Sequence, residues 1–200
     1  MKNLFSFGET VEGYNVNVIN EREARAGAGI LFLFAILSFL YAYTYMDFRF
    51  TKVFITFFMV DFFIRVLINP KFAPSLIAGR IAIAHQKPEY VGAPPKRFAW
   101  SIGLLLAVVM FVIVVVLELM TSVKIGICLL CLVLLYCEAV FGICIGCKLY
   151  NLVMKNEAQY CPGGVCEVHE KEAIQTINPM QILIVLIAAI LATYFVIKVI

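Results

Sequence analysis

Five apolar stretches, each about as long as a bilayer is thick, constrain this chain more than any other feature of its sequence. A helix that crosses a bilayer needs about 20 mostly apolar residues. The stretches cover residues 28–46, 50–68, 98–120, 125–147 and 180–200. A soluble chain of 200 residues, 63% hydrophobic and 14% charged, could not bury so much apolar surface. The sequence therefore predicts a polytopic membrane protein.

The predicted fold is an all-α bundle of five transmembrane helices in a single integral-membrane domain. Helices are expected because backbone polar groups in lipid must find partners within the same segment. Between the second and third stretches, residues 76–85 have helical periodicity but are too short to span. We expect a short helix at the membrane surface there, with Pro74 in its first turn. The consecutive prolines predict that residues 86–97 are extended.

Basic residues predict the orientation of the bundle. Eleven of the sixteen Lys and Arg residues lie in residues 1–27, 69–97 and 148–179, and four lie at the opposite ends of the spans. Cytoplasmic loops carry the excess of basic residues. We therefore expect the amino terminus and these loops in the cytoplasm and the carboxyl terminus outside. Basic residues spread over loops in this way indicate topology and no nucleic-acid partner.

Charged residues inside the predicted spans form the first candidate site. Asp61 and Arg65 are four residues apart, so they share one helix face and can neutralise each other. Glu138 has no basic residue within a turn and needs a bound proton or a partner from another helix, such as Arg65. These residues either fix helix packing or handle ions, protons or anions. Together with Arg80, they are the candidate residues for binding an anionic substrate.

Cysteines form the second candidate site. Cys144 and Cys147 make a C-x-x-C motif at the expected cytoplasmic end of the fourth span, beside Lys148, whose charge favours thiolate formation. Cys161 and Cys166 flank a Pro-Gly-Gly turn in the 148–179 loop. The other three cysteines are interpreted as small core residues, namely Cys128, Cys131 and Cys137.

Two cysteine pairs on one side of the membrane leave several uses open. With His169 they resemble the ligand set of a soft metal such as zinc or copper, although the spacing departs from a double C-x-x-C. They also suit dithiol–disulfide exchange or the transient carriage of a sulfane sulfur. They can also be inert, and a reducing cytoplasm disfavours permanent disulfides. No cofactor is otherwise predicted.

Gly142 and Gly146 are four residues apart in the fourth stretch. On one helix they would form a small-residue face for close helix packing. We expect this face to serve internal packing or a homo-oligomer.

Three motifs resemble the signatures of a bacterial four-span inner-membrane family of unknown function. They are Asn69-Pro-Lys-Phe-Ala-Pro74, the run from Gln86 to Trp100 and the run from Gly142 to Tyr150. The resemblance covers about residues 20–155 and implies a bacterial inner membrane. The association of some members with rhodanese-like or thioredoxin-like proteins implies thiol or sulfane-sulfur handling, with such a protein as partner and with Cys144 and Cys147 as the reactive pair.

The leading expectation is therefore an inner-membrane protein that handles thiols or sulfur at its cytoplasmic face. In one alternative, Asp61, Arg65 and Glu138 line the path of a transporter or channel subunit. In the others the chain is a structural membrane partner or binds a soft metal. The sequence leaves open whether the protein is an enzyme.

Overall fold

The computed structural model describes residues 7–118, 122–154 and 179–199, which are mostly helical. The chain divides into two compact units, residues 1–167 and residues 168–200. The described part of the second unit is one apolar helix, α7 (Pro179–Val199), where the fifth span was predicted.

The first unit is a bundle of long helices joined by short elements. In chain order, the first half contains β1 (Val18–Asn20), α1 (Glu21–Tyr45), α2 (Arg49–Phe63), the π-helical segment η1 (Ile64–Ile68), the 3₁₀ helix η2 (Pro70–Phe72), α3 (Pro74–Ala82) and β2 (Tyr90–Gly92). The second half contains α4 (Ala93–Phe111), the π-helical segment η3 (Val112–Val116), α5 (Ser122–Tyr136), the π-helical segment η4 (Cys137–Phe141) and α6 (Ile145–Met154).

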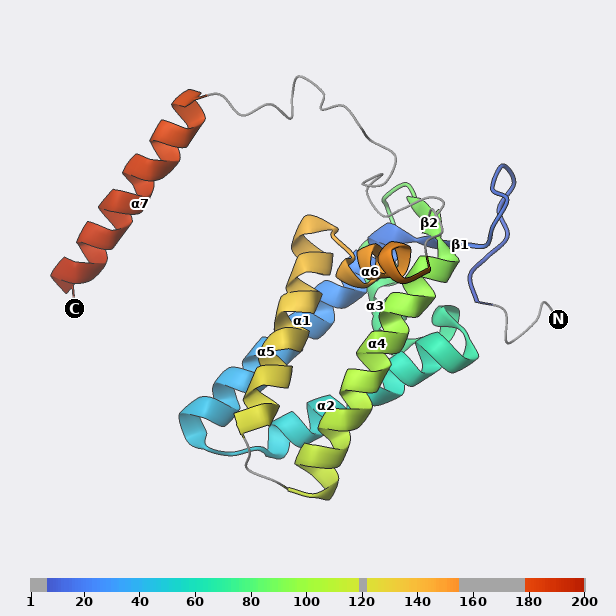
Figure 1. Cartoon of the computed structure of the whole chain (residues 1–200), viewed down its shortest axis with the longest axis horizontal. Coiled ribbons are helices and arrows are strands. Elements are labelled where there is room, and N and C mark those ends of the chain that lie inside the picture. Colours follow the sequence, from blue (N-terminus) through green and yellow to red (C-terminus); the bar gives the residue numbers. More distant parts are fainter. Residues whose placement is uncertain (1–6, 119–121, 155–178, 200) are drawn as a thin grey trace. The chain divides into compact units, whose positions relative to one another are not determined.

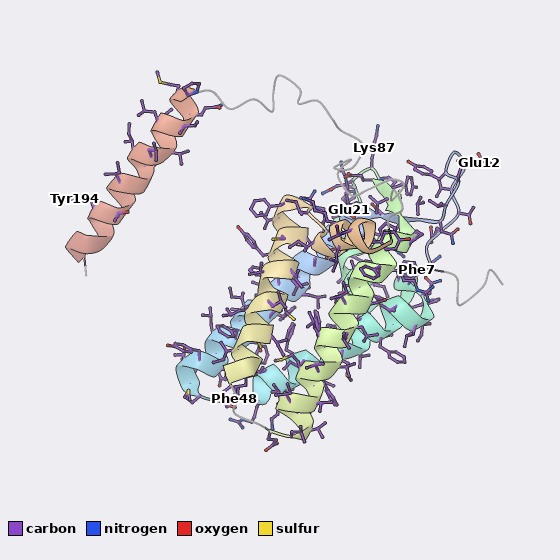
Figure 2. The ribbon with its side chains drawn as sticks, viewed as in Figure 1. Phe7, Glu12, Glu21, Phe48, Lys87 and Tyr194 are labelled. Carbon is purple, nitrogen blue, oxygen red and sulfur yellow. A yellow bond between two sulfur atoms is a disulfide. The ribbon has the colours of Figure 1, made fainter. Side chains whose placement is uncertain are left out.

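The bundle has two distinct ends. Helix α1 packs against α2, α3 and α5, while α4 packs against α2 and α6. The two-stranded sheet, α3 and α6 gather at one end, which we call the sheet end (Figure 1). The α1–α2 turn lies at the other, which we call the Phe48 end, and Figure 2 shows Glu21 and Phe48 at opposite ends of the bundle. Within the first unit, the described parts of the segments expected in the cytoplasm, namely β1, β2, α3 and α6, therefore lie at one end.

Three helices in the described residues are long and apolar enough to cross a membrane. They are Glu21–Tyr45, Ala93–Val116 and Lys124–Phe141. This indicates a membrane protein with an all-α architecture, as predicted. The predicted second span forms α2 and η1, but it contains Lys52, Asp61 and Arg65, so its composition differs from that of the three apolar helices.

The prediction that residues 86–97 are extended is wrong for the last part of that segment. Helix α4 begins at Ala93 and holds both Pro94 and Pro95 in its first turn. The N–H groups of a first turn have no partner within the helix, so proline costs little there. The preceding residues form β2, whose Gly92 pairs with Val18 of β1.

The prediction of one helix over residues 125–147 is also wrong. The helix ends at Phe141, and Gly142 adopts a left-handed conformation with a φ of 65°. Glycine is the usual residue at such a helix end, because it has no Cβ to clash. Helix α6 then starts afresh at Ile145, so Gly142 and Gly146 do not form one helix face.

The short helix predicted in the 69–97 loop is confirmed as α3, with Pro74 in its first turn. It packs closely against the first turns of α1. A Cβ at Gly79 would lie 2.9 Å from the carbonyl oxygen of Glu23 and 2.9 Å from the backbone nitrogen of Gly27. The absence of a side chain at Gly79 therefore lets the two helix backbones meet.

Replacing Gly79 by alanine should destabilise this contact by about 1–3 kcal/mol, because backbone atoms of α1 cannot move aside as a side chain can. Gly126→Ala is the matched control, since a Cβ there has no neighbour within 4 Å. Alanine at that exposed helical position should leave the free energy of unfolding unchanged or raise it by up to about 1 kcal/mol. Unfolding of the purified variants in detergent measures both effects. Equal stability of the two variants would contradict the close packing.

Candidate functional site

Asp61 and Arg65 form a buried ion pair at the sheet end, as their spacing predicted. Arg65 Nε donates to Asp61 Oδ2 at 2.7 Å. The Asp61 side chain is 0% exposed and the Arg65 side chain 1%. Ser75 completes the cluster by donating from its backbone N–H to Asp61 Oδ1 at 2.8 Å and from its hydroxyl to the same carboxylate. Asp61 therefore binds the first turn of α3, where the helix dipole favours an anion.

Aromatic rings enclose the cation of this pair. The Arg65 guanidinium carbon lies 4.6 Å from the ring centre of Phe62 and 5.0 Å from that of Trp100 in α4. Both rings attract the charge through their π-faces. The cluster thus links α2, α3 and α4, which favours a role in packing over one in binding a substrate.

A second buried cluster joins α1, α4 and η4. The Lys96 ammonium lies 2.8 Å from Glu21 Oε2 and 2.7 Å from Glu138 Oε1, and the Lys96 side chain is fully buried. Two carboxylates thus share one cation. An unpaired ammonium or carboxylate in such surroundings would cost several kcal/mol, which explains why all three charges meet.

Of the two alternatives predicted for Glu138, a bound proton or a partner from another helix, the structure shows a partner, but it is not Arg65 as suggested. Arg65 is committed to Asp61 and Ser75, and Lys96 takes its place at Glu138. Sequence reasoning missed Lys96 because it was assigned to an extended loop. The signal was the Pro94-Pro95 pair, which is suited to a first helical turn and so indicates that Lys96 belongs to a helix.

Arg80, the remaining candidate for anion binding, also has an internal partner. Its guanidinium donates two hydrogen bonds to the Glu23 carboxylate, at 2.9 and 3.0 Å. The hydrogen bond to Glu23 raises the pKa of Arg80 above its ordinary value. Arg80 therefore tethers α3 to α1, and it lies in neither buried cluster.

Cys144 and Cys147 form a disulfide where α6 begins. The carbonyl oxygen of Cys144 accepts the N–H of Lys148, and its Sγ accepts the N–H of Cys147 at 3.3 Å. Cys144 thus occupies the position of a helix N-cap. A thiolate formed there would be stabilised by that N–H and by the helix dipole.

Helix α6 holds this disulfide against α4. A Cβ at Gly146 would lie 2.5 Å from Cβ of Ala99, and the rings of Phe98 and Tyr150 meet edge to face with centres 5.5 Å apart. Gly146 therefore packs inside the chain, and Gly142 lies against the Arg25 guanidinium. The Cys144 and Cys147 residues are only 7% and 3% exposed.

The structure describes only some of the other cysteines and histidines of the predicted sulfur site. Cys161, Cys166 and His169 lie outside the described residues. Cys128, Cys131 and Cys137 are free thiols of intermediate exposure, so they are only partly buried and not the core residues that were predicted, and none is part of the α6 site. Within the described residues, no group of three or more His, Cys, Asp and Glu side chains could hold a metal ion. The zinc or copper site predicted for the four thiols and His169 is thus untested.

A comparison with protein-family models identifies the family. The model described as Domain of unknown function (DUF4395) matches residues 19–155, about two thirds of the chain, so the chain belongs to that family. No curated protein and no solved structure matches the chain.

Replacing Lys96 by methionine should destabilise the bundle by about 3–5 kcal/mol, because it leaves the buried Glu21 carboxylate and the partly buried Glu138 carboxylate without their cation. Lys52→Met is the matched control, because it removes the ion pair between Lys52 and the largely exposed Glu118 side chain. This variant should change the free energy of unfolding little. Adding Glu21→Gln and Glu138→Gln to Lys96→Met should restore part of the loss. Equal stability of the Lys96 and Lys52 variants would contradict the cluster.

Proposed function

We propose that this DUF4395 protein carries out thiol chemistry at the cytoplasmic face of a bacterial inner membrane, with Cys144 and Cys147 as its working dithiol. The observation that carries the proposal is the Cys144–Cys147 disulfide at the N-terminus of α6. This arrangement lets the pair alternate between dithiol and disulfide, because both sulfurs are already within bonding reach and the helix terminus stabilises the thiolate form of Cys144.

The exchange reaction needs no further group from the protein. The Cys144 thiolate attacks a disulfide R–S–S–R, forms a mixed disulfide and releases one thiolate R–S⁻. The Cys147 thiolate then attacks Cys144 Sγ, closes the internal disulfide and releases the second R–S⁻. In the sulfur-transfer version, the Cys144 thiolate takes a sulfane sulfur from a persulfide and releases the donor thiolate.

Cys144 is assigned as the attacking thiol and Cys147 as the resolving thiol. Cys144 is the more exposed of the two, and its Sγ already accepts the N–H of Cys147. Both side chains are nevertheless buried, so a protein partner requires α6 to move away from α4. The family resemblance points to a thioredoxin-like or rhodanese-like partner, and Cys161 and Cys166 are proposed as its relay thiols.

The proposed topology places this site in the cytoplasm. It has five spans, with α2–η1 and α7 added to the three apolar helices. The amino terminus and the sheet end face the cytoplasm, and the carboxyl terminus lies outside. The buried pair Asp61–Arg65 lets α2 cross the membrane because the two charges neutralise each other inside the bundle.

Transport through Asp61, Arg65 and Glu138 stays an alternative. The described contacts place Asp61 and Arg65 in one cluster and Glu138 in another, each with internal partners. No contact in the described residues joins the three into a path, so we place thiol chemistry first.

Cys147→Ser should trap a mixed disulfide on Cys144. When the reduced variant meets glutathione disulfide, Cys144 should carry one glutathione as a stable adduct, because the resolving thiol is absent. In the wild type and in the matched control Cys137→Ser, Cys147 should expel the glutathione and leave the internal disulfide. Peptide mass spectrometry locates each adduct. An adduct on Cys137 but none on Cys144, or the same accumulation on Cys144 in all three proteins, would rule out the assigned roles.

Reporter fusions to the full chain test the topology. Green fluorescent protein at the amino terminus should fluoresce in the cytoplasm of a bacterial host. Alkaline phosphatase at the carboxyl terminus should be active, because this enzyme folds only outside the cytoplasm, whereas green fluorescent protein at the same end should be dark. A fluorescent carboxyl-terminal fusion would show an even number of spans.

A further inference from the structure

Helix α6 has two faces of different character. On one face, Gly146 and Tyr150 pack against α4. Ile145, Leu149 and Leu152 are 41%, 42% and 77% exposed. Their spacing of four and three residues places them within about 60° of one another around the helix, on the side opposite the α4 contacts. Helix α6 therefore has an apolar stripe, Ile145, Leu149 and Leu152, that the described chain leaves largely exposed.

The contacts with α4 show how α6 is oriented. Gly146 packs against Ala99, and the Tyr150 ring meets the Phe98 ring. From Gly146 to Tyr150 the axis of α6 advances by about 6 Å, whereas Phe98 and Ala99 differ by only about 1.5 Å along α4. Helix α6 therefore lies across the sheet end of α4 (Figure 1). Because α4 has the length and composition of a membrane span, α6 is nearly parallel to the plane of the bilayer.

The same contacts indicate the depth of α6 in the membrane. Helix α4 is part of the apolar helix Ala93–Val116, whose 24 residues make it about 36 Å long. It exceeds the hydrocarbon core of a bilayer, about 30 Å thick, by about 3 Å at each end when it is centred. Ala99 is about 9 Å along the helix from Ala93, so it lies about 6 Å from the hydrocarbon boundary. Amphipathic helices at an interface bury their apolar faces about 5–10 Å deep, so lipid surrounds the apolar stripe at this depth.

The apolar stripe also continues the outward surface of the preceding span. Only 11% of the apolar helix Lys124–Phe141 is buried, so most of this helix faces away from the bundle. Its last two residues, Val140 and Phe141, are exposed. Ile145 follows Phe141 by four residues and so lies within about 14 Å of it. One exposed apolar surface therefore extends from η4 onto α6, at a depth that a soluble partner does not reach.

Lys148 adds a positive charge beside the apolar stripe. Its side chain is exposed, and the ion pairs of the described residues do not include it. A lysine on an apolar surface extends its ammonium along the surface to the head groups. The phosphate of an anionic phospholipid complements that charge.

We propose that α6 is an interfacial helix whose apolar stripe lies among phospholipid chains and whose Lys148 binds the phosphate of an anionic phospholipid. The proposal rests on α4 crossing the membrane, as in the topology proposed above. It does not depend on thiol exchange at Cys144 and Cys147, because only the outer face of α6 contacts the lipid.

Photocrosslinking of the purified full chain in nanodiscs tests the proposal. The nanodiscs contain phosphatidylglycerol and phosphatidylcholine in equal amounts. One variant carries the photoreactive residue benzoylphenylalanine in place of Leu152, whose exposure leaves room for it. Illumination should give phospholipid adducts that mass spectrometry identifies. In the matched control the same residue replaces Tyr150, on the opposite face of α6, and should link to α4 and not to lipid.

Other occupants of the apolar stripe would give different products. Links from position 152 to a second copy of the chain or to residues 155–178, without lipid adducts, would overturn the proposal. Equal amounts of lipid adduct from positions 150 and 152 would overturn it as well, because the contact would not be specific to one face.

The variant Lys148→Gln tests the head-group contact. In the chain with the photoreactive residue at position 152, phosphatidylglycerol adducts should outnumber phosphatidylcholine adducts. Lys148→Gln should lower this ratio about five-fold, the effect of one cation near a membrane surface. Lys87→Gln is the matched control, since Lys87 is exposed at the same end of the bundle but outside α6, and should leave the ratio unchanged (Figure 2). An unchanged ratio in Lys148→Gln, or an equal fall in both variants, would contradict the assignment of Lys148.

These readouts separate the lipid contact from the proposed function. The adducts report what lies beside α6 whether Cys144 and Cys147 are oxidised or reduced. Lipid adducts at position 152 would therefore support the interfacial helix even if the two cysteines do not exchange with other thiols.

Discussion

A buried charge must meet an opposite charge inside the same chain, and the sheet end of this protein is organised by that requirement. Lys96, in the first turn of α4, holds Glu21 of α1 and Glu138 of η4. One turn later Trp100 lies against Arg65, which pairs with Asp61 and Ser75. The first two turns of α4 therefore connect two ion clusters whose residues come from α1, α2, η1, α3, α4 and η4. Together the two clusters fix how the helices enter the bundle.

This arrangement separates the residues that hold the fold from those available for chemistry. In the sequence, Asp61, Arg65 and Glu138 suggest a polar pathway through the membrane. In the structure each of them has a partner within the chain. The Cys144–Cys147 disulfide lies outside both ion clusters. It sits on α6, a short helix held against the same turns of α4 by the contacts of Gly146 and Tyr150. The proposed access to Cys144 requires α6 to move away from these turns.

The sequence was informative wherever an interaction is local. The Asp61–Arg65 pair needs only helical spacing, α3 needs only Pro74 and a short apolar pattern, and the positions of the apolar helices follow from composition. The partner of Glu138 could not be found in this way, because Lys96 lies 42 residues away in sequence and its position depends on where α4 begins. The break at Gly142 was missed because the apolar run continues through it, and only the backbone conformation shows that the helix stops. Whether two thiols of a C-x-x-C are joined is likewise absent from the sequence.

The reduction midpoint of the Cys144–Cys147 pair tests the central claim most directly. The purified full chain is equilibrated in glutathione buffers of graded potential, and differential alkylation with peptide mass spectrometry gives the oxidised fraction of this pair alone. A dithiol that exchanges with cellular thiols should show one two-electron transition at about −300 to −180 mV, the range of the thioredoxin and glutathione systems. A pair that stays oxidised or stays reduced throughout that range would show that Cys144 and Cys147 do not work as a dithiol.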